Sequence, residues 1–132
     1  MTPELTWLTA TALITAVMWV PYIVVLIGQM GLVGALTDPH HETEIETRWA
    51  RRAKRAHINA VENLVVFAPL AIAVHLTGTS TSMTATVCAV FFYSRLAHYV
   101  VYTAGIPVIR TLLFAAGWIC QMILALTLLG WA

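Results

Sequence analysis

Four long runs of apolar residues, separated by short polar segments, dominate this chain. The runs cover residues 5–30, 56–77, 83–103 and 107–131. A membrane-spanning helix needs about 20 predominantly apolar residues, so each run is long enough to cross a bilayer. The pattern therefore predicts an all-α integral membrane four-helix bundle, forming a single domain over residues 1–132, with helices at about 5–30, 48–77, 82–104 and 107–131.

Proline, threonine and charge mark details of these helices. Pro21 lies inside the first run, where a kink is expected because proline cannot donate to the helix ladder. Thr43 or Thr47 is suited to cap the second helix, and Pro107 fits the first turn of the fourth. The first run is too long for a signal-peptide core and has no basic residues before it. We therefore expect it to be a retained helix.

The composition supports the membrane class independently of any motif. The chain of 132 residues is 60% hydrophobic and only 10% charged, whereas soluble domains carry about 25% charged residues. Cys88 and Cys120 lie inside predicted spans, where cysteine packs as a small hydrophobic residue. No metal-ligand spacing is present, and the adjacent His40 and His41 do not supply one. We expect neither a metal nor a nucleic-acid partner.

The distribution of basic residues predicts the orientation in the membrane. Five of the seven lie in or beside the first loop: Arg48, Arg51, Arg52, Lys54 and Arg55. Arg95 and Arg110 flank the third loop, whereas the second loop, 78–82, carries no charge. By the positive-inside rule, loops one and three are cytoplasmic and both termini lie outside. The simplest role of Arg51 and Lys54 is to bind anionic lipid head groups. Our default location is a bacterial inner membrane.

A row of polar side chains follows one face of the second predicted helix. Arg52, Arg55, Asn59 and Glu62 fall within an arc of about 100° when successive residues are placed about 100° apart. A charge at bilayer depth costs a few kcal/mol, so such residues normally face protein or water. Glu62 either forms a buried ion pair with Arg55 or Arg95, or accepts the ammonium group of a ligand whose carboxylates are held by arginine.

A second polar row follows the third predicted helix, with Arg95, His98 and Tyr102 at spacing i, i+3 and i+7. Arg110 and Thr111 lie in the first turn of the fourth helix, where backbone N–H groups are free to stabilise an anion such as a thiolate. Simpler roles are a positive-inside anchor for Arg110, a structural histidine for His98 and an aromatic-belt residue for Tyr102. The two rows together indicate a pocket for a small charged ligand near the cytoplasmic end.

Two segments carry a resemblance to a known family: residues 52–63 (RAKRAHINAVEN) and residues 95–111, from RLAH to the arginine and threonine of the fourth helix. In these segments the chain resembles the MAPEG family, the membrane-associated proteins of eicosanoid and glutathione metabolism. The resemblance implies a left-handed four-helix bundle assembled as a homotrimer, with glutathione bound between subunits near the cytoplasmic side. It assigns thiolate stabilisation, the catalytic role, to Arg110 and Thr111. It assigns glutathione contacts to Arg55, Asn59, Glu62, Arg95 and Tyr102. We add Arg52 and His98 of the two polar rows as further candidates for binding glutathione.

Two functions from different classes follow. The leading hypothesis is a glutathione-dependent transferase or peroxidase acting on lipophilic electrophiles or lipid hydroperoxides, and Arg110 favours it. The alternative is a non-catalytic protein that binds lipid or acts as a scaffold on the same fold. Ile58 and the absence of a basic residue at the end of helix one favour this alternative. A small multidrug exporter is rejected because helix one holds only Glu4, at its outer end.

Overall fold

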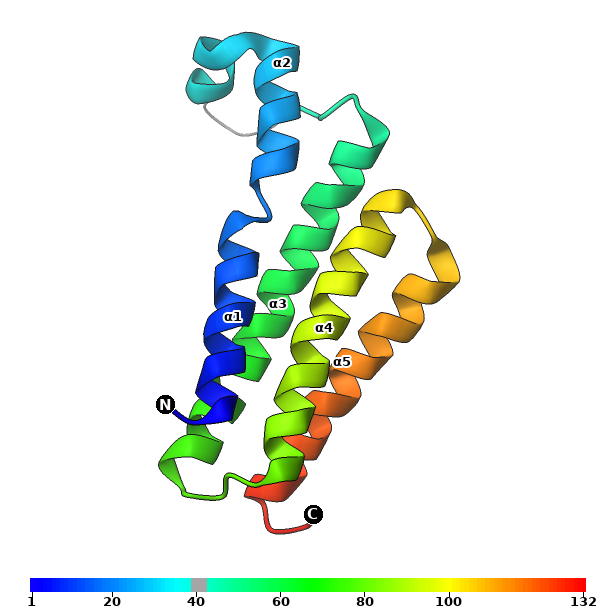
Figure 1. Ribbon diagram of the computed structural model, residues 1–132. Helices are drawn as coiled ribbons and strands as arrows, with labels where there is room; N and C mark the ends of the chain where they lie inside the picture. Colours follow the sequence, from blue (N-terminus) through cyan, green and yellow to red (C-terminus); the bar gives the residue numbers. More distant parts are fainter. Residues whose placement is uncertain (39–42) are drawn as a thin grey trace.

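The computed structural model describes residues 1–38 and 43–132. In this part of the chain the secondary structure consists of helices joined by short turns (Figure 1). Within these described residues, four segments are long and apolar enough to cross a membrane. The prediction of an all-α membrane four-helix bundle is therefore confirmed. His40 and His41 lie outside the described residues. The helices are α1 (Pro3–Val17), α2 (Val20–Thr37), α3 (Arg48–Leu76), α4 (Ser82–Ala104) and α5 (Pro107–Leu128).

The first span is divided into two helices one turn before Pro21. α1 ends at Val17 and α2 begins at Val20, with Pro21 in its first turn. A proline ring clashes with the carbonyl four residues earlier, which is that of Val17, so a continuous helix is interrupted there. The Met18 carbonyl at the break accepts a hydrogen bond from the Tyr99 hydroxyl of α4, at 2.9 Å. The kink expected from the sequence thus separates the span into two helices, and Tyr99 of the neighbouring helix satisfies a carbonyl at the junction.

The same span also extends beyond the predicted limits of 5–30. It runs from Pro3 to Thr37, and Gly31 interrupts it with a φ of 79°. Glycine adopts a positive φ without the steric cost that a Cβ atom brings. After Gly31 the chain turns away from the axis of α2 (Figure 1). In this last part of the span, the large apolar side chains of Leu32, Val33 and Leu36 are exposed.

Helix α4 is the central element of the bundle and packs against α1, α3 and α5. Phe67 of α3 and Phe91 of α4 stack with ring centroids 3.9 Å apart and are both fully buried. Small residues allow backbones to approach closely in membrane bundles, and α3 buries several alanines along its packed face. The main core cluster consists of Phe67, Ala71, Val74, Val87, Cys88, Phe91, Cys120 and Leu124.

A buried carboxylate joins α1 to the turn between α3 and α4. Glu4 is fully buried, and its two oxygens accept hydrogen bonds from Ser80 at 2.8 and 3.0 Å. Thr84 donates to the same carboxylate at 2.5 Å and also belongs to the capping box that begins α4. From the sequence, Glu4 was placed only at the outer end of the first helix. The structure shows that it fixes the helix ends opposite to the polar pockets described below.

Replacing Glu4 with alanine should therefore destabilise the bundle. The variant removes the carboxylate that accepts from Ser80 and Thr84, and the loss of a hydrogen bond to a charged group costs about 1.5–3 kcal/mol. Thermal unfolding in detergent should show a lower midpoint for Glu4→Ala than for Thr6→Ala, whose exposed hydroxyl bonds only to the carbonyl of Thr2 at the N-cap of α1. Equal midpoints for the two variants would show that the carboxylate does not hold the helix ends together.

Candidate functional site

A strongly basic pocket lies where the beginning of α3 meets the turn between α4 and α5. Its volume is about 550 Å³. Side chains far apart in the sequence converge here because the end of α4 and the start of α5 lie beside the first turns of α3 (Figure 1). We call it the cationic pocket. It is lined by Glu44, Arg51, Arg52, Lys54, Arg55, Ile58, Tyr102 and Arg110.

A smaller pocket of about 240 Å³ adjoins the cationic pocket. The two share the side chains of Tyr102 and Arg110. Asn59 lies one helical turn after Arg55, so this second pocket lies further along α3, toward the middle of the membrane. We call it the inner pocket. It is lined by Asn59, His98, Tyr102, Arg110, Thr111 and Phe114.

Arg110 is held at the boundary between the two pockets. Its Cζ atom lies 4.8 Å from the centroid of the Tyr102 ring, a cation–π contact between α5 and α4. Pro107 occupies the first turn of α5, and the N-terminus of that helix adds a partial positive charge. Thr111 in the same turn donates its hydroxyl to the Pro107 carbonyl at 3.2 Å. The guanidinium and the helix N-terminus together favour an anionic group at this position.

Arg52 is fixed by the turn that joins α4 to α5. Its Nε donates to the Thr103 carbonyl at 2.9 Å. Gly105 ends α4 with a φ of 82°, and a Cβ atom there would lie 3.2 Å from Cζ of Arg52. Two independent reasons therefore favour glycine at position 105: the left-handed backbone conformation and the close approach of the Arg52 guanidinium.

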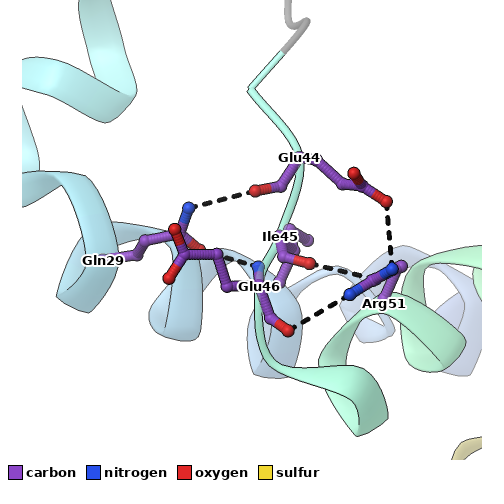
Figure 2. A network of polar contacts seen from close by, with 5 residues as sticks. All are labelled: Gln29, Glu44, Ile45, Glu46 and Arg51. Atoms are coloured by element: carbon purple, nitrogen blue, oxygen red, sulfur yellow. Dashed lines mark hydrogen bonds and ion pairs between the residues drawn. The ribbon is translucent and has the colours of Figure 1, made fainter.

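Two side chains, those of Gln29 and Arg51, hold the segment before α3 in place (Figure 2); Glu44 of this segment lines the cationic pocket. Gln29 of α2 donates to the Glu44 carbonyl and accepts from the Glu46 N–H, both at 3.0 Å. Arg51 donates to the carbonyls of Ile45 and Glu46 at 3.1 and 3.2 Å and pairs with the Glu44 carboxylate at 3.0 Å. The charge of Arg51 is thus neutralised, so it serves to hold this segment in place.

The other arginines of the pocket keep their charge available. Among the residues that the structure describes, Arg52, Arg55 and Arg110 have no carboxylate within ion-pair distance. Guanidinium groups bind carboxylates through two parallel hydrogen bonds. The cationic pocket therefore offers several binding positions for a ligand with more than one negative charge, with Glu44 as the acidic group on its edge.

Arg95 lies behind the inner pocket and does not line it. It is only 2% exposed, and it donates to Asn59 Oδ1 at 3.1 Å and to the Leu113 carbonyl at 2.9 Å. Its Nε is buried without a hydrogen-bond partner in the described chain. Gly117 of α5 makes room for the guanidinium, because a Cβ atom there would lie 3.0 Å from it. Arg95 thus reaches the pocket only through Asn59.

Two further amide side chains join this buried group, and the sequence analysis did not name them. Asn63 donates to the Asn59 carbonyl at 2.9 Å and to Asn59 Oδ1 at 3.3 Å. Gln121 of α5 donates to the Asn63 carbonyl at 3.2 Å and to its Oδ1 at 3.3 Å. A side-chain amide inside an otherwise apolar span normally faces protein, so the position of Gln121 in the fourth span already indicates a buried polar contact.

Glu62 differs from the expectation drawn from the sequence. We expected an ion pair with Arg55 or Arg95 or a place in the ligand site. In the described chain it has no ion pair and lines neither pocket, and its side chain is exposed. The reason is geometric: α5 contacts Asn63 on the packed face of α3, and Glu62 points about 100° away from it.

The remaining predicted residues are brought together by the fold. Those that line one or both pockets are Arg52, Arg55, Asn59, His98, Tyr102, Arg110 and Thr111. His98 is buried, and its ring centroid lies 5.6 Å from that of Tyr102. Glu62 and Arg95 lie outside the pockets. Side chains from both polar rows and from the start of α5 therefore line two adjoining pockets.

Comparison with known proteins agrees with the fold. The model of the MAPEG family matches residues 5–130, which is nearly the whole chain. No curated protein and no solved structure matches it. Since the match covers far more than half of the chain and reaches into each membrane-spanning segment, the chain belongs to the MAPEG family.

Proposed function

We propose that the protein is a glutathione-dependent membrane transferase or peroxidase that acts on lipophilic electrophiles or lipid hydroperoxides. The observation that carries this proposal is the convergence of Arg52, Arg55 and Arg110, none of them ion-paired in the described chain, on one pocket beside Tyr102. Membership of the MAPEG family, whose members generally use glutathione, supports the choice of ligand.

The donor set of the pocket fits glutathione. The tripeptide carries two carboxylates, one ammonium group and one thiol. Arg52 and Arg55 would hold the carboxylates, since a guanidinium matches a carboxylate in geometry and charge. Tyr102 would contact the peptide between them, and Asn59 would contact the part of the ligand that enters the inner pocket. Arg110 stands at the junction of the pockets, where the sulfur would enter the inner pocket.

The chemistry that these residues support is thiolate formation. A guanidinium and a helix N-terminus lower the pKa of a thiol placed against them. When bound, glutathione supplies the sulfur, whose electron pair forms the new bond to the electrophilic carbon while the leaving group departs with its own pair. Arg110 holds the anion, and the N-terminus of α5, beside Thr111, adds a partial positive charge. In this mechanism no side chain of the protein needs to be the nucleophile.

We further propose that the site is completed in a homotrimer. Glu62 is exposed on a membrane-spanning helix of the single chain. A carboxylate facing lipid at the helix centre costs about 2.5–3.5 kcal/mol, so it is normally covered by protein. A neighbouring copy packed on this face would cover Glu62 and bring it to the ligand's ammonium group. Native mass spectrometry of the detergent complex should then give the mass of three chains, and a monomer would contradict this assembly.

The location of the pockets agrees with an orientation in which the site faces the cytoplasm. Both termini lie at the end of the bundle opposite to the turn between α4 and α5 (Figure 1). Since the basic residues gather at the pocket end, the positive-inside rule places that end in the cytoplasm and the termini outside. Exposed Ile109 and Leu112 on α5 offer the lipophilic substrate an apolar approach from the membrane. A bacterial inner membrane suits this arrangement.

Activity of the detergent-purified protein tests the proposal. We expect glutathione to be consumed in the presence of an aromatic halide or a lipid hydroperoxide, at a rate that saturates with glutathione. For the hydroperoxide, two glutathione molecules should yield one disulfide, one alcohol and one water. Saturable glutathione binding without turnover of either substrate class would favour the non-catalytic alternative, a lipid-binding or scaffold protein.

A further inference from the structure

We propose that Arg95, Asn63 and Gln121 are positioning residues that fix the Asn59 amide with its N–H group available to the inner pocket. The inner pocket then selects a hydrogen-bond acceptor, which in the proposed reaction is the anionic sulfur of the ligand. This inference rests on the proposed function for the identity of the ligand. The orientation of the amide rests on contacts within the chain alone.

Arg95 determines which way the Asn59 amide is turned. A guanidinium has five N–H donors and no acceptor. The Asn59 atom that lies 3.1 Å from Arg95 Nη1 must therefore be the oxygen. This assignment does not depend on distinguishing the oxygen from the nitrogen of the amide by their positions. With Oδ1 held by Arg95, the Nδ2 group is the part of the amide left for other contacts.

Asn63 reinforces the same orientation from within α3. Its Nδ2 donates to the Asn59 carbonyl at 2.9 Å and to Asn59 Oδ1 at 3.3 Å, so the oxygen receives two donors. Asn63 is itself oriented by Gln121, whose Nε2 donates to Asn63 Oδ1. Each amide is thus turned by the next, from α5 through α3 to the pocket.

Burial makes this orientation persistent. Arg95, Asn63 and Gln121 are 2%, 8% and 3% exposed, respectively. Inside a membrane span no water replaces a lost hydrogen bond. Reversing the Asn59 amide would turn its N–H group toward the donors of Arg95 and Asn63. Asn59 itself is only half-buried and lines the inner pocket. Its Nδ2 makes no hydrogen bond within the described chain, so it remains available to a ligand.

The groups that face the inner pocket are therefore matched to an anion. Asn59 contributes an N–H donor, and Arg110 contributes a positive charge from the opposite helix. Thr111 uses its hydroxyl hydrogen on the Pro107 carbonyl. A thiolate would receive a hydrogen bond from Asn59 and a charge contact from Arg110, whereas a thioether would gain little from either.

Two ligands distinguish positioning from a merely structural role. Binding of glutathione and of S-methylglutathione, which lacks an ionisable sulfur, is measured by calorimetry on the purified full chain above the pKa of the bound thiol. Gln121→Met removes the amide with little change in length. We expect it to weaken glutathione binding about fivefold to tenfold, the loss of one hydrogen bond, and to leave S-methylglutathione binding unchanged. Thr127→Val on the same helix is the control, because that hydroxyl bonds only to the Ile123 carbonyl.

Asn59→Asp provides a second test that does not depend on Gln121. An aspartate keeps an acceptor for Arg95 and so preserves the buried contact, but it replaces the pocket-facing N–H with a negative oxygen. We expect glutathione binding to fall about 100-fold at an unchanged midpoint of thermal unfolding, because a like charge then opposes the thiolate.

The outcomes separate the inference from the proposed function. If Gln121→Met weakens both ligands equally, or Asn59→Asp binds glutathione as tightly as the wild type, the inference is overturned and the proposed function stands. If the wild-type protein binds neither ligand, both are overturned. Selective loss of glutathione binding in the two variants, with Thr127→Val unchanged, supports the inference.

Discussion

Replacing Arg110 with alanine should lower glutathione-dependent turnover about 100- to 1,000-fold, the usual effect of removing one preorganised group that stabilises developing negative charge. In the structure Arg110 lines both pockets and is held over the Tyr102 ring at 4.8 Å. Without it, the pKa of the bound thiol should rise toward that of a free thiol, about 8.5. Steady-state rates and the ultraviolet absorbance of the thiolate, recorded against pH, measure the two effects.

Arg48→Ala is the matched control for this result. Arg48 is also at the basic end of the bundle, but it is exposed and lines neither pocket. A lysine at position 110 should restore only part of the activity, because it keeps the charge but not the planar fork or the stacking on Tyr102. Equal rates in Arg110→Ala and Arg48→Ala would show that Arg110 has no part in the reaction.

Replacing Gly117 with alanine should destabilise the protein by about 1–3 kcal/mol, the usual cost of overpacking a filled interior. The added Cβ atom would lie 3.0 Å from the guanidinium of Arg95. That guanidinium has little freedom to withdraw, because it is buried and bonded to Asn59 and Leu113. We therefore expect a lower midpoint of thermal unfolding in detergent, together with weaker glutathione binding if Asn59 is displaced.

Gly28→Ala provides the opposite case with the same chemical change. A Cβ atom on Gly28 meets nothing within 4 Å. In a helix interior alanine is favoured over glycine by about 0.5–1 kcal/mol, so this variant should be at least as stable as the wild type. If both variants lose the same stability, the effect of Gly117→Ala does not come from its contact with Arg95.

The helical periodicity predicted which helix faces line the two pockets. Arg55 and Asn59 lie one turn apart on α3, and His98 and Tyr102 lie one turn apart on α4, so a period of 3.6 residues was enough to place each pair on one face. Their meeting with Arg110 follows from the short turn before α5. A short connection between two spans leaves neighbouring helices antiparallel and their ends together.

The sequence did not predict which polar residues of each row are buried. Glu62 and Asn63 are neighbours on α3, yet the packing of α5 buries Asn63 and leaves Glu62 exposed. A rotation of α3 by about 100° about its axis would exchange them. The rotation is determined by contacts between distant segments, such as that of Gln121 with Asn63, and a pattern within one helix does not contain it.

The sequence pattern likewise does not predict that Arg51 and Arg52 have different roles. Arg51 is neutralised by Glu44 and holds the segment before α3, whereas Arg52 bonds to the end of α4 and has no carboxylate partner in the described chain. Both fall in one basic run, and composition treats them alike. Their roles differ because Gln29 holds the segment before α3 where Glu44 can pair with Arg51 (Figure 2).

Titration of glutathione into the purified wild-type protein at neutral pH, followed by thiolate absorbance, tests the central claim most directly. The arrangement of Arg52, Arg55 and Arg110 predicts saturable binding and the appearance of thiolate absorbance at a pH where free glutathione remains largely protonated. Absence of binding at millimolar glutathione would contradict the account. The pockets would then belong to another anionic ligand or to the packing of the bundle.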